Sequence, residues 1–591
     1  MAVQAPSVAD LLSQAGQAFG GNFLNLLATE PDMAAGLQRI AAASSPKLAA
    51  LQAQLSQKHL ALWSAMMARD SGKDVQPVAR AEPGDRRFAS AEWQAGTHFD
   101  YLRQAYLINA QFLRDTVEAL ELDARAKGRL RFVARQVIDA MSPANFAATN
   151  PDALKLAQET RGESLTSGLK NLLEDVHKGR ISTTDESAFE VGRNLAITEG
   201  AVVFENELLQ LIQYQPLTAT VRKRPLLVFP PCINKYYVLD LQPENSFVRY
   251  AVQQGNTVFM VSWRNILPEQ GHYTWDDYLG LGVIKALEVV RDLSGMDKLN
   301  LIGYCVGGTM LAAVLAILAS KGEEWVESLT FLTSLHDFSD AGEIGLFVDE
   351  PSVAAREAAI GKGGIMPGRE LAAVFSALRA NDLVWSYVVN NYLKGRPPAA
   401  FDLLHWNADS TNLPGPMYCW YVRNMYLENN LTVPGKLTML GVPVDLSRVR
   451  HPTYVLATRE DHIVPWMSAY QTTQLMRGQM RFVLGESGHV AGVVNPAAKN
   501  RRSYWVNERV SPPADPQAWL AGSEQRRGSW WSDWQAWLAG SEQRRGSWWS
   551  DWNAWLAQFS GGKAKAKKRL GSSRYKVIEP APGRYVKQRV V

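Results

Sequence analysis

The chain has 591 residues, a formal net charge of +4, 46% hydrophobic residues and three cysteines. This length exceeds what one compact core usually holds, so we expect at least two domains. Three cysteines without CxxC spacing argue against a disulfide framework and a zinc site, and we expect no metal site. The first basic residue is Arg39, and the longest apolar run, residues 310–319, is far short of the roughly 20 residues of a membrane span. We therefore expect neither an export signal nor a transmembrane segment, and a cytoplasmic protein.

Residues 1–190 are predicted to form a mainly helical N-terminal domain. Apolar residues recur at helical spacing from Phe99 through Leu122. Residues 71–87 are rich in proline, glycine and charge, which predicts a loop or linker. From Val191 onward, short β-rich runs alternate with helical ones, as in an α/β sheet. The predicted strands include residues 226–229, 257–262, 299–302, 329–333 and 453–457.

The most informative segment is residues 303–309, which read Gly-Tyr-Cys-Val-Gly-Gly-Thr. It follows a predicted strand and precedes a helix-like run, which is the layout of a nucleophile elbow with Cys305 in the place usually held by serine. Gly303 and Gly307 flank the nucleophile, because a tight turn leaves no room for larger side chains there. A thiolate in this position attacks acyl carbonyls. The alternative is a buried structural cysteine, but core packing does not call for the flanking glycines.

An activated cysteine needs a base and a group that orients the base. His489 follows a short predicted strand and a polar glycine turn, and Asp461 follows another predicted strand. The order Cys305, Asp461, His489 is that of the α/β-hydrolases. His489 could instead be an ordinary turn residue, and Asp461 or its neighbour Glu460 could be a solvated loop charge.

The second donor of an oxyanion hole should come from a loop after an earlier strand. Residues 224–234 have that form, an apolar strand followed by a proline-stiffened loop. We predict the backbone amides of Val306 and of Ile233 or Asn234 as the donors. The alternative is an ordinary turn at the end of the strand.

The C-terminal region contains an identical tandem repeat, because residues 517–534 recur without change as residues 535–552. At 3.6 residues per turn, one repeat unit has the length of about five helical turns. Ser529 and Ser547 are predicted helix N-caps. Trp530, Trp534, Trp537 and Leu538 form a helical stripe, which we expect to pack on the catalytic domain rather than to bind apolar polymer. Residues 560–591 carry ten basic residues and one acid, Glu579, and we expect a solvated tail rather than a surface that binds nucleic acid.

Several segments together resemble the class I polyhydroxyalkanoate synthases, which polymerise short 3-hydroxyacyl-CoA thioesters. The resemblance extends over nearly the whole chain, although the second copy of the repeat departs from the family pattern. The segments that carry it are residues 230–237, 241–246, 303–309, 381–385, 406–412, 460–466, 488–489 and 582–587.

The resemblance implies an α/β-hydrolase catalytic domain at residues 191–515, with a cap at about residues 335–430 that can block or open the site and take part in dimerisation. Residues 516–591 then hold the tryptophan-rich repeat and the basic tail. It also implies catalytic roles for Cys305, Asp461 and His489, a covalent acyl-cysteine, and an (R)-3-hydroxyacyl-CoA substrate, with 3-hydroxybutyryl-CoA expected. Coenzyme A is the leaving group and no other cofactor is expected. The expected partners are a second copy of the chain and the surface of a polyester granule.

Two other functions fit parts of the sequence. A polyester depolymerase or thioesterase has the same fold, but its elbow usually carries serine. A non-catalytic granule-coat protein needs amphipathic helices but no elbow, acid or histidine.

Overall fold

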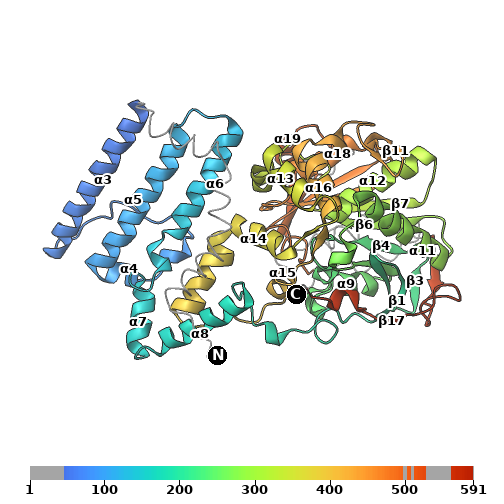
Figure 1. The fold of residues 1–591 in the computed structure, drawn as a ribbon, viewed down its shortest axis with the longest axis horizontal. Coiled ribbons are helices and arrows are strands. Elements are labelled where there is room, and N and C mark those ends of the chain that lie inside the picture. The colour runs from blue at the N-terminus through green and yellow to red at the C-terminus, as the bar shows by residue number, and fades with distance from the viewer. Residues whose placement is uncertain (1–45, 497–498, 500–501, 508–511, 528–560, 590–591) are drawn as a thin grey trace. The chain divides into compact units, whose positions relative to one another are not determined.

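The computed structural model describes residues 46–496, 499, 502–507, 512–527 and 561–589 (Figure 1). By its internal contacts the chain divides into two compact units. The first comprises residues 1–185 and 379–399, and the second comprises residues 186–378 and 400–591. The predicted Ser529 and Ser547 caps and the tryptophan stripe from Trp530 to Leu538 lie outside the described residues.

The described part of the first unit is helical, as predicted. Helix α3 packs on α5 through Leu62, Met66 and Ile108, all of which are buried. Asp123 caps α6 by accepting hydrogen bonds from two backbone amides, and Asn150 caps α7 with proline at the next position. The helices of this unit before residue 186 are α3 Pro46–Asp70, α4 Glu92–Ala95, α5 Thr97–Ala119, α6 Ala124–Ala140, α7 Pro151–Glu159 and α8 Glu163–Lys178, with short 3₁₀ turns at Arg86–Phe88 and Pro143–Asn145.

Residues 379–399 belong to the first unit although they lie in the middle of the second unit's sequence. They form two π-helical turns, η9 Asn381–Trp385 and η10 Val388–Leu393. The Tyr392 hydroxyl is 2.8 Å from a carboxylate oxygen of Asp175, and the Asn391 amide donates to the carbonyl of Ser182 at 2.8 Å. The segment predicted as one cap, residues 335–430, is therefore divided between the two units.

The second unit is built on a mixed sheet of eleven strands, which together with the helical first unit confirms the predicted fold class. The strand order is β15-β14-β13-β12-β7-β6-β4-β5-β2-β1-β17. The six adjacent strands from β13 to β5 in this order are parallel to one another. The strand pairs on either side of them are antiparallel. The strands are β1 Gly200–Glu205, β2 Leu209–Tyr214, β4 Leu226–Phe229, β5 Val258–Trp263, β6 Leu299–Tyr304, β7 Val326–Leu332, β12 Thr453–Thr458, β13 Met480–Gly485, β14 Ser503–Val506, β15 Glu524–Arg527 and β17 Glu579–Pro580.

Alternation along the strands divides the core between the two faces of the sheet. In β4, Leu227 and Phe229 join one apolar cluster, while Leu226 and Val228 join the other. The first cluster contains most of helix α12 Val306–Lys321, whose residues from Val306 to Leu318 are all buried. Because both faces of the parallel strands are covered, β4 and β5 read as nearly continuous apolar runs rather than alternating ones.

The remaining elements of the second unit surround this sheet (Figure 1). The helices are α9 Phe247–Gln253, α10 Trp275–Asp277, which continues through the π-helical η7 Tyr278–Ile284 into α11 Lys285–Ser294, α13 Glu350–Ile360, α14 Gly368–Leu378, α15 Asp402–Asn407, α16 Gly415–Tyr421, α17 Trp466–Tyr470, α18 Thr472–Leu475 and α19 Pro516–Ala521. Three two-stranded sheets pair β3 Thr220–Arg222 with β16 Lys563–Lys565, β8 Ile365–Met366 with β9 Leu413–Pro414, and β10 Thr438–Met439 with β11 Val442–Pro443. None of the helices in the described residues is both long and apolar enough to cross a bilayer.

The basic C-terminal tail is more structured than predicted. Its lysine run is exposed, as expected, but β17 adds an eleventh strand beside β1. Tyr585 and Val586 are buried, and the Arg584 guanidinium donates to Glu579 at 2.9 Å. The prediction of a solvated tail is therefore wrong for residues 579–587, because their apolar side chains cover the outer strands of the sheet.

A buried ion pair fixes the loop that follows β4. The Lys235 ammonium lies 2.7 Å from the Asp409 carboxylate, with side-chain exposures of 2% and 8%. The Tyr237 hydroxyl donates to the same carboxylate at 3.0 Å, and the Trp406 indole donates to the carbonyl of Lys235 at 2.6 Å. Burial lowers the pKa of Lys235, against the opposing effect of the Asp409 charge. Residues 406–412 are thus tied to the loop at residues 232–237.

Replacing Asp409 by Asn should destabilise the second unit strongly. The substitution leaves the Lys235 charge buried without a counter-charge, and breaking a buried pair in this way costs about 3–5 kcal/mol. The matched control is Glu324→Gln, which breaks the Lys298–Glu324 pair, whose acid is 80% exposed; surface pairs contribute less than about 1 kcal/mol. Denaturant unfolding measures both, and equal losses in the two variants would contradict the role given to Asp409.

Candidate active site

Cys305 lies on a sharp turn between β6 and α12. Its backbone has φ 52° and ψ −128°, a conformation that a residue with a side chain rarely adopts. The Cys305 amide donates to the carbonyl of Leu332 in β7 at 3.0 Å, and the Cys305 carbonyl accepts from the Gly308 amide at 2.8 Å. These bonds hold the strained turn from both sides, so the side chain projects from the end of the strand. The thiol is half-buried.

The glycines around Cys305 are required by close backbone contacts, as the sequence predicts for Gly303 and Gly307. A Cβ atom on Gly303 would lie 2.5 Å from the Cα of Gly308. One on Gly307 would lie 2.4 Å from the carbonyl oxygen of Phe229, at the end of β4, and one on Gly308 would lie 2.1 Å from the Ser334 hydroxyl. The elbow is therefore pressed against the ends of β4 and β7.

The structure brings Asp461 and His489 together from the ends of two neighbouring strands. Asp461 follows β12 and His489 follows β13, and the two strands are parallel and adjacent. The Nδ1 atom of His489 is 2.8 Å from an Asp461 carboxylate oxygen. The carboxylate also accepts from the amides of Ile463 and Val464 at 2.9 and 2.8 Å, so its position is fixed. With Nδ1 bound to Asp461, Nε2 is the nitrogen left for Cys305.

Charge and burial act in opposite directions on His489. Burial lowers its pKa, but the charges of Asp461 and Cys305 and hydrogen bonds to both side chains raise it to about 10. A protonated imidazole between the Asp461 and Cys305 side chains satisfies all of these interactions. The surroundings of His489 therefore favour its protonated form.

The residues predicted for the oxyanion hole lie on two neighbouring segments. Val306 is the first residue of α12, and amides in the first turn of a helix have no acceptor within the helix. Ile233 and Asn234 lie on the loop after β4, and the close approach of Gly307 to Phe229 and Pro230 brings this loop beside the elbow. The backbone at Asn234 forms an antiparallel bridge with Ser410. The assignment of these amides as donors stays a prediction.

Sequence reasoning missed several side chains around the elbow. The Tyr304 ring stacks on His489, with centroids 5.6 Å apart. His336, fully buried behind the elbow, is 2.8 Å from the Thr472 hydroxyl through Nδ1, and burial lowers its pKa to about 4. Tyr421 and Tyr426 make edge-to-face contacts with Phe338 and with each other, and the charge of Cys305 raises the pKa of both phenols further than burial alone. His336 could have been noticed in the sequence, because it closely follows the predicted strand at residues 329–333.

Two further cysteines, one arginine and one histidine differ in their burial and partners. Cys232 and Cys419 are buried free thiols, and burial raises the pKa of each, that of Cys419 to about 11. Arg379 pairs with Asp382 at 3.1 Å on an exposed part of the first unit. His462 is half-buried in the loop beside Asp461. Among the described residues, no group of three or more His, Cys, Asp or Glu side chains is arranged to hold a metal ion.

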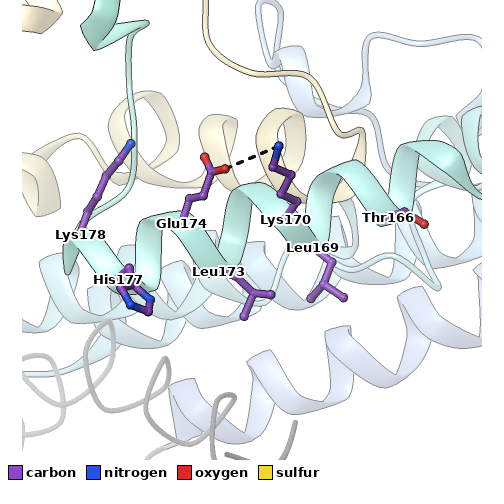
Figure 2. A pocket seen from close by; sticks show the side chains of 7 residues that line it. All are labelled: Thr166, Leu169, Lys170, Leu173, Glu174, His177 and Lys178. Carbon is purple, nitrogen blue, oxygen red and sulfur yellow. Dashed lines mark ion pairs between the residues drawn. The ribbon is translucent and has the colours of Figure 1, made fainter. Parts of the chain in front are cut away.

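An open hollow lies along α8 in the first unit (Figure 2). Leu169 and Leu173 form its apolar part, and Lys170 and Glu174 make an exposed ion pair of 3.9 Å on the same helix. It contains one histidine, His177, and no cysteine or hydroxyl nucleophile paired with it. This hollow therefore lacks the constellation found around Cys305.

Comparisons with known proteins agree on the family. Residues 84–251 match the family described as "Poly-beta-hydroxybutyrate polymerase (PhaC) N-terminus", and residues 225–496 match the alpha/beta hydrolase fold. The chain is 52% identical to the poly(3-hydroxyalkanoate) polymerase subunit of Cupriavidus necator, over 94% of this chain and 91% of that protein. It is 42% identical to the corresponding subunit of Rhizobium meliloti, over 80% of this chain and 78% of that one. A poly(3-hydroxyalkanoate) polymerase of Methylorubrum extorquens is also 42% identical, over 82% of this chain and 81% of that one.

The pKa of His489 should fall when Cys305 is replaced by Ala. The charge of Cys305 and its hydrogen bond both raise this pKa, so their removal should bring it below the value of about 10 in the unchanged protein. Carbon-13 NMR of histidine-labelled protein measures the titration, with His489→Gln assigning the signal. His336, whose pKa is set by burial, is the internal control. An unchanged His489 titration would argue against contact with Cys305.

The same shift predicts how stability depends on pH. Because the pKa of His489 is raised in the folded state from its ordinary 6.5, protonation stabilises the fold fully below about pH 6.5. This contribution should disappear as the pH rises through about 10, and the loss should be smaller in Cys305→Ala. Thermal unfolding between pH 6 and 10 compares the two proteins, and parallel curves would refute the coupling.

Proposed function

Because the chain belongs to the poly(3-hydroxyalkanoate) polymerase family, we propose that Cys305, His489 and Asp461 carry out the acyl transfers of this polymerase. The observation that carries the proposal is the chain of side-chain contacts from Asp461 through His489 to Cys305, built at the ends of three parallel strands. A strained elbow, a buried base and an orienting carboxylate are the parts that covalent acyl transfer needs.

The first half of the reaction loads an acyl group on the enzyme. The Cys305 thiolate attacks the thioester carbonyl of an (R)-3-hydroxyacyl-CoA, which we take to be 3-hydroxybutyryl-CoA. The bond from the acyl carbon to the sulfur of coenzyme A breaks, and the protonated His489 gives its proton to that sulfur. The exchange of one thioester for another is close to isoenergetic, which is a reason for cysteine rather than serine at the elbow. Coenzyme A is the leaving group, and the proposal requires no other cofactor.

The second half forms the ester bond. His489, now neutral, takes the proton from the 3-hydroxyl group of a hydroxyacyl unit, and the hydroxyl oxygen attacks another acyl thioester. When that thioester is the acyl-cysteine, the Cys305 sulfur leaves as a thiolate beside the protonated His489. The site is then ready to attack the next substrate thioester. The amides of Val306 and of Ile233 or Asn234 would donate to the oxyanion in both halves.

Three further features belong to the same proposal. We propose that the chain acts in the cytoplasm, that it forms a homodimer, and that it associates with the surface of its polyester product. They are supported by the resemblance of the sequence to the class I synthases.

Cys305→Ala should abolish the release of coenzyme A while leaving the fold intact. Removal of a nucleophile that acts together with its base typically lowers turnover by at least about 10⁴-fold. Release of coenzyme A from 3-hydroxybutyryl-CoA measures turnover, and circular dichroism checks the fold. Cys419→Ala is the matched control, because this cysteine is a buried thiol in α16. Full activity in Cys305→Ala would refute the assignment of the nucleophile.

The product formed from 3-hydroxybutyryl-CoA separates a synthase from a hydrolase of the same fold. A synthase produces turbidity and an insoluble polyester together with coenzyme A, because a hydroxyl group accepts the acyl chain. A thioesterase produces free 3-hydroxybutyrate, and a depolymerase or granule-coat protein releases no coenzyme A. Accumulation of the free acid as the main product would contradict the proposed function.

A further inference from the structure

The first copy of the C-terminal repeat is docked on the second unit. Helix α19 begins one residue before this copy and strand β15 lies within it, and Asp515 caps α19 by accepting from the amides of Gln517 and Ala518. Strand β15 pairs antiparallel with β14, with Ser503 opposite Arg527 and Val506 opposite Glu524. The docked segment, residues 515–527, therefore closes one end of the eleven-stranded sheet.

The segment is anchored by one buried indole. Trp519 is 1% exposed and packs edge-to-face on Phe482 of β13, with ring centroids 4.7 Å apart. Its ring also lies 6.0 Å from that of Tyr470 in α17, and its carbonyl accepts from the Asn507 side chain at 2.9 Å. We call Tyr470, Phe482, Asn507 and the edge of β14 that pairs with β15 the docking site.

The same docking residues recur one repeat unit later, in residues 533–545, most of which belong to the second copy. Asp533 corresponds to the cap Asp515, Trp537 to the anchor Trp519, and residues 542–545 to β15. Strand pairing and the bond from Asn507 use backbone atoms of the docked segment, which do not depend on sequence. Residues 533–545 differ from residues 515–527 only in having Trp534 in the place of Pro516, at the first turn of the helix.

A third, partial copy is excluded. Asp551 and Trp555 repeat the cap and the anchor, but the residues that would correspond to β15 are 560–563. Lys563 already pairs with Arg222 in the small sheet of β16 and β3. Only residues 533–545 can therefore reproduce both the helix and the strand.

The lengths of the connecting segments favour docking of residues 515–527 and docking of residues 533–545 almost equally. Docking of residues 515–527 leaves residues 507–514 to connect from β14 and residues 528–562 to connect to β16. Docking of residues 533–545 lengthens the first connection to residues 507–532 and shortens the second to residues 546–562. The probability of closing a loop falls with about the 3/2 power of its length, so the two changes nearly cancel, which leaves about a twofold preference for the first copy.

When residues 533–545 are docked, residues 546–562 are long enough to connect them to β16. Fully extended, residues 546–562 span about 56 Å. Six strand spacings separate β15 from β4, which follows β3 directly in the chain, and they amount to roughly 29 Å. Docking of the second copy therefore leaves the pairing of β16 with β3 in place.

We propose that residues 533–545 exchange with residues 515–527 in the docking site, so that the chain has two registers that differ by one repeat unit. In either register one copy closes the edge of the sheet and the other is released. The duplication therefore leaves no register with an open β14 edge, which would otherwise be free to pair with another chain.

Four variants test the exchange: Trp519→Ala, Trp537→Ala, the double substitution, and Trp519→Ala in a chain that lacks residues 535–552. Hydrogen exchange measured by mass spectrometry reports the protection of the β14 amides at residues 503–506. Protection should stay within about threefold of the unchanged protein in both single variants. It should fall by at least tenfold in the double variant and in the shortened chain, where no intact copy remains.

The alanine substitution in each single variant also gives the two copies different masses, so mass spectrometry can tell which copy is protected. In Trp519→Ala the second copy should become the protected one, and in Trp537→Ala the first. Loss of protection in Trp519→Ala as large as in the double variant would overturn the proposal. It would also be overturned if the protection in Trp519→Ala fell on dilution, since the occupant would then come from a second chain.

Discussion

The strained backbone at Cys305 is the constraint on which the rest of the second unit depends. Strand β6 ends at Tyr304 and helix α12 begins at Val306, so a single residue with positive φ joins them. This geometry is held only because Gly303, Gly307 and Gly308 let the turn press against the ends of β4 and β7. The contacts that remove space for side chains also bring the loop after β4 beside Cys305. Strain, glycines and the neighbouring strand ends thus form one arrangement rather than three separate features.

The second requirement is electrostatic. A buried imidazole is neutral by default, since burial disfavours its charged form. Here the Asp461 carboxylate, itself fixed by the amides of Ile463 and Val464, reverses that preference, and the charge of Cys305 adds to it. In the proposed mechanism this proton is the one given to the departing thiolate of coenzyme A. In that mechanism each attacking hydroxyl returns a proton to His489, so no proton has to enter from solvent during chain growth.

Sequence reasoning could place Cys305, Asp461 and His489 because each follows a strand in a parallel sheet, where all carboxyl ends meet at one edge. It could not find the Lys235–Asp409 pair, since the two residues are far apart in the chain and neither lies in a pattern that predicts burial of a charge. It also could not predict that residues 379–399 join the first unit. Their apolar residues suit a helix in either unit, and the choice is made by polar partners such as Asp175 and Ser182, which no periodicity reveals.

Both ends of the eleven-stranded sheet are closed by the C-terminal part of the chain, with β15 at one end and β17 at the other. Ten strand spacings separate them, about 48 Å. Residues 528–578, which connect the two strands, can span roughly three times that distance, and after the loss of one repeat unit the remainder still reaches about 110 Å. The length of this connection is therefore not set by the geometry of the sheet. That is the physical reason a duplicated unit can be accommodated here, whereas an insertion between β6 and α12 would destroy the elbow.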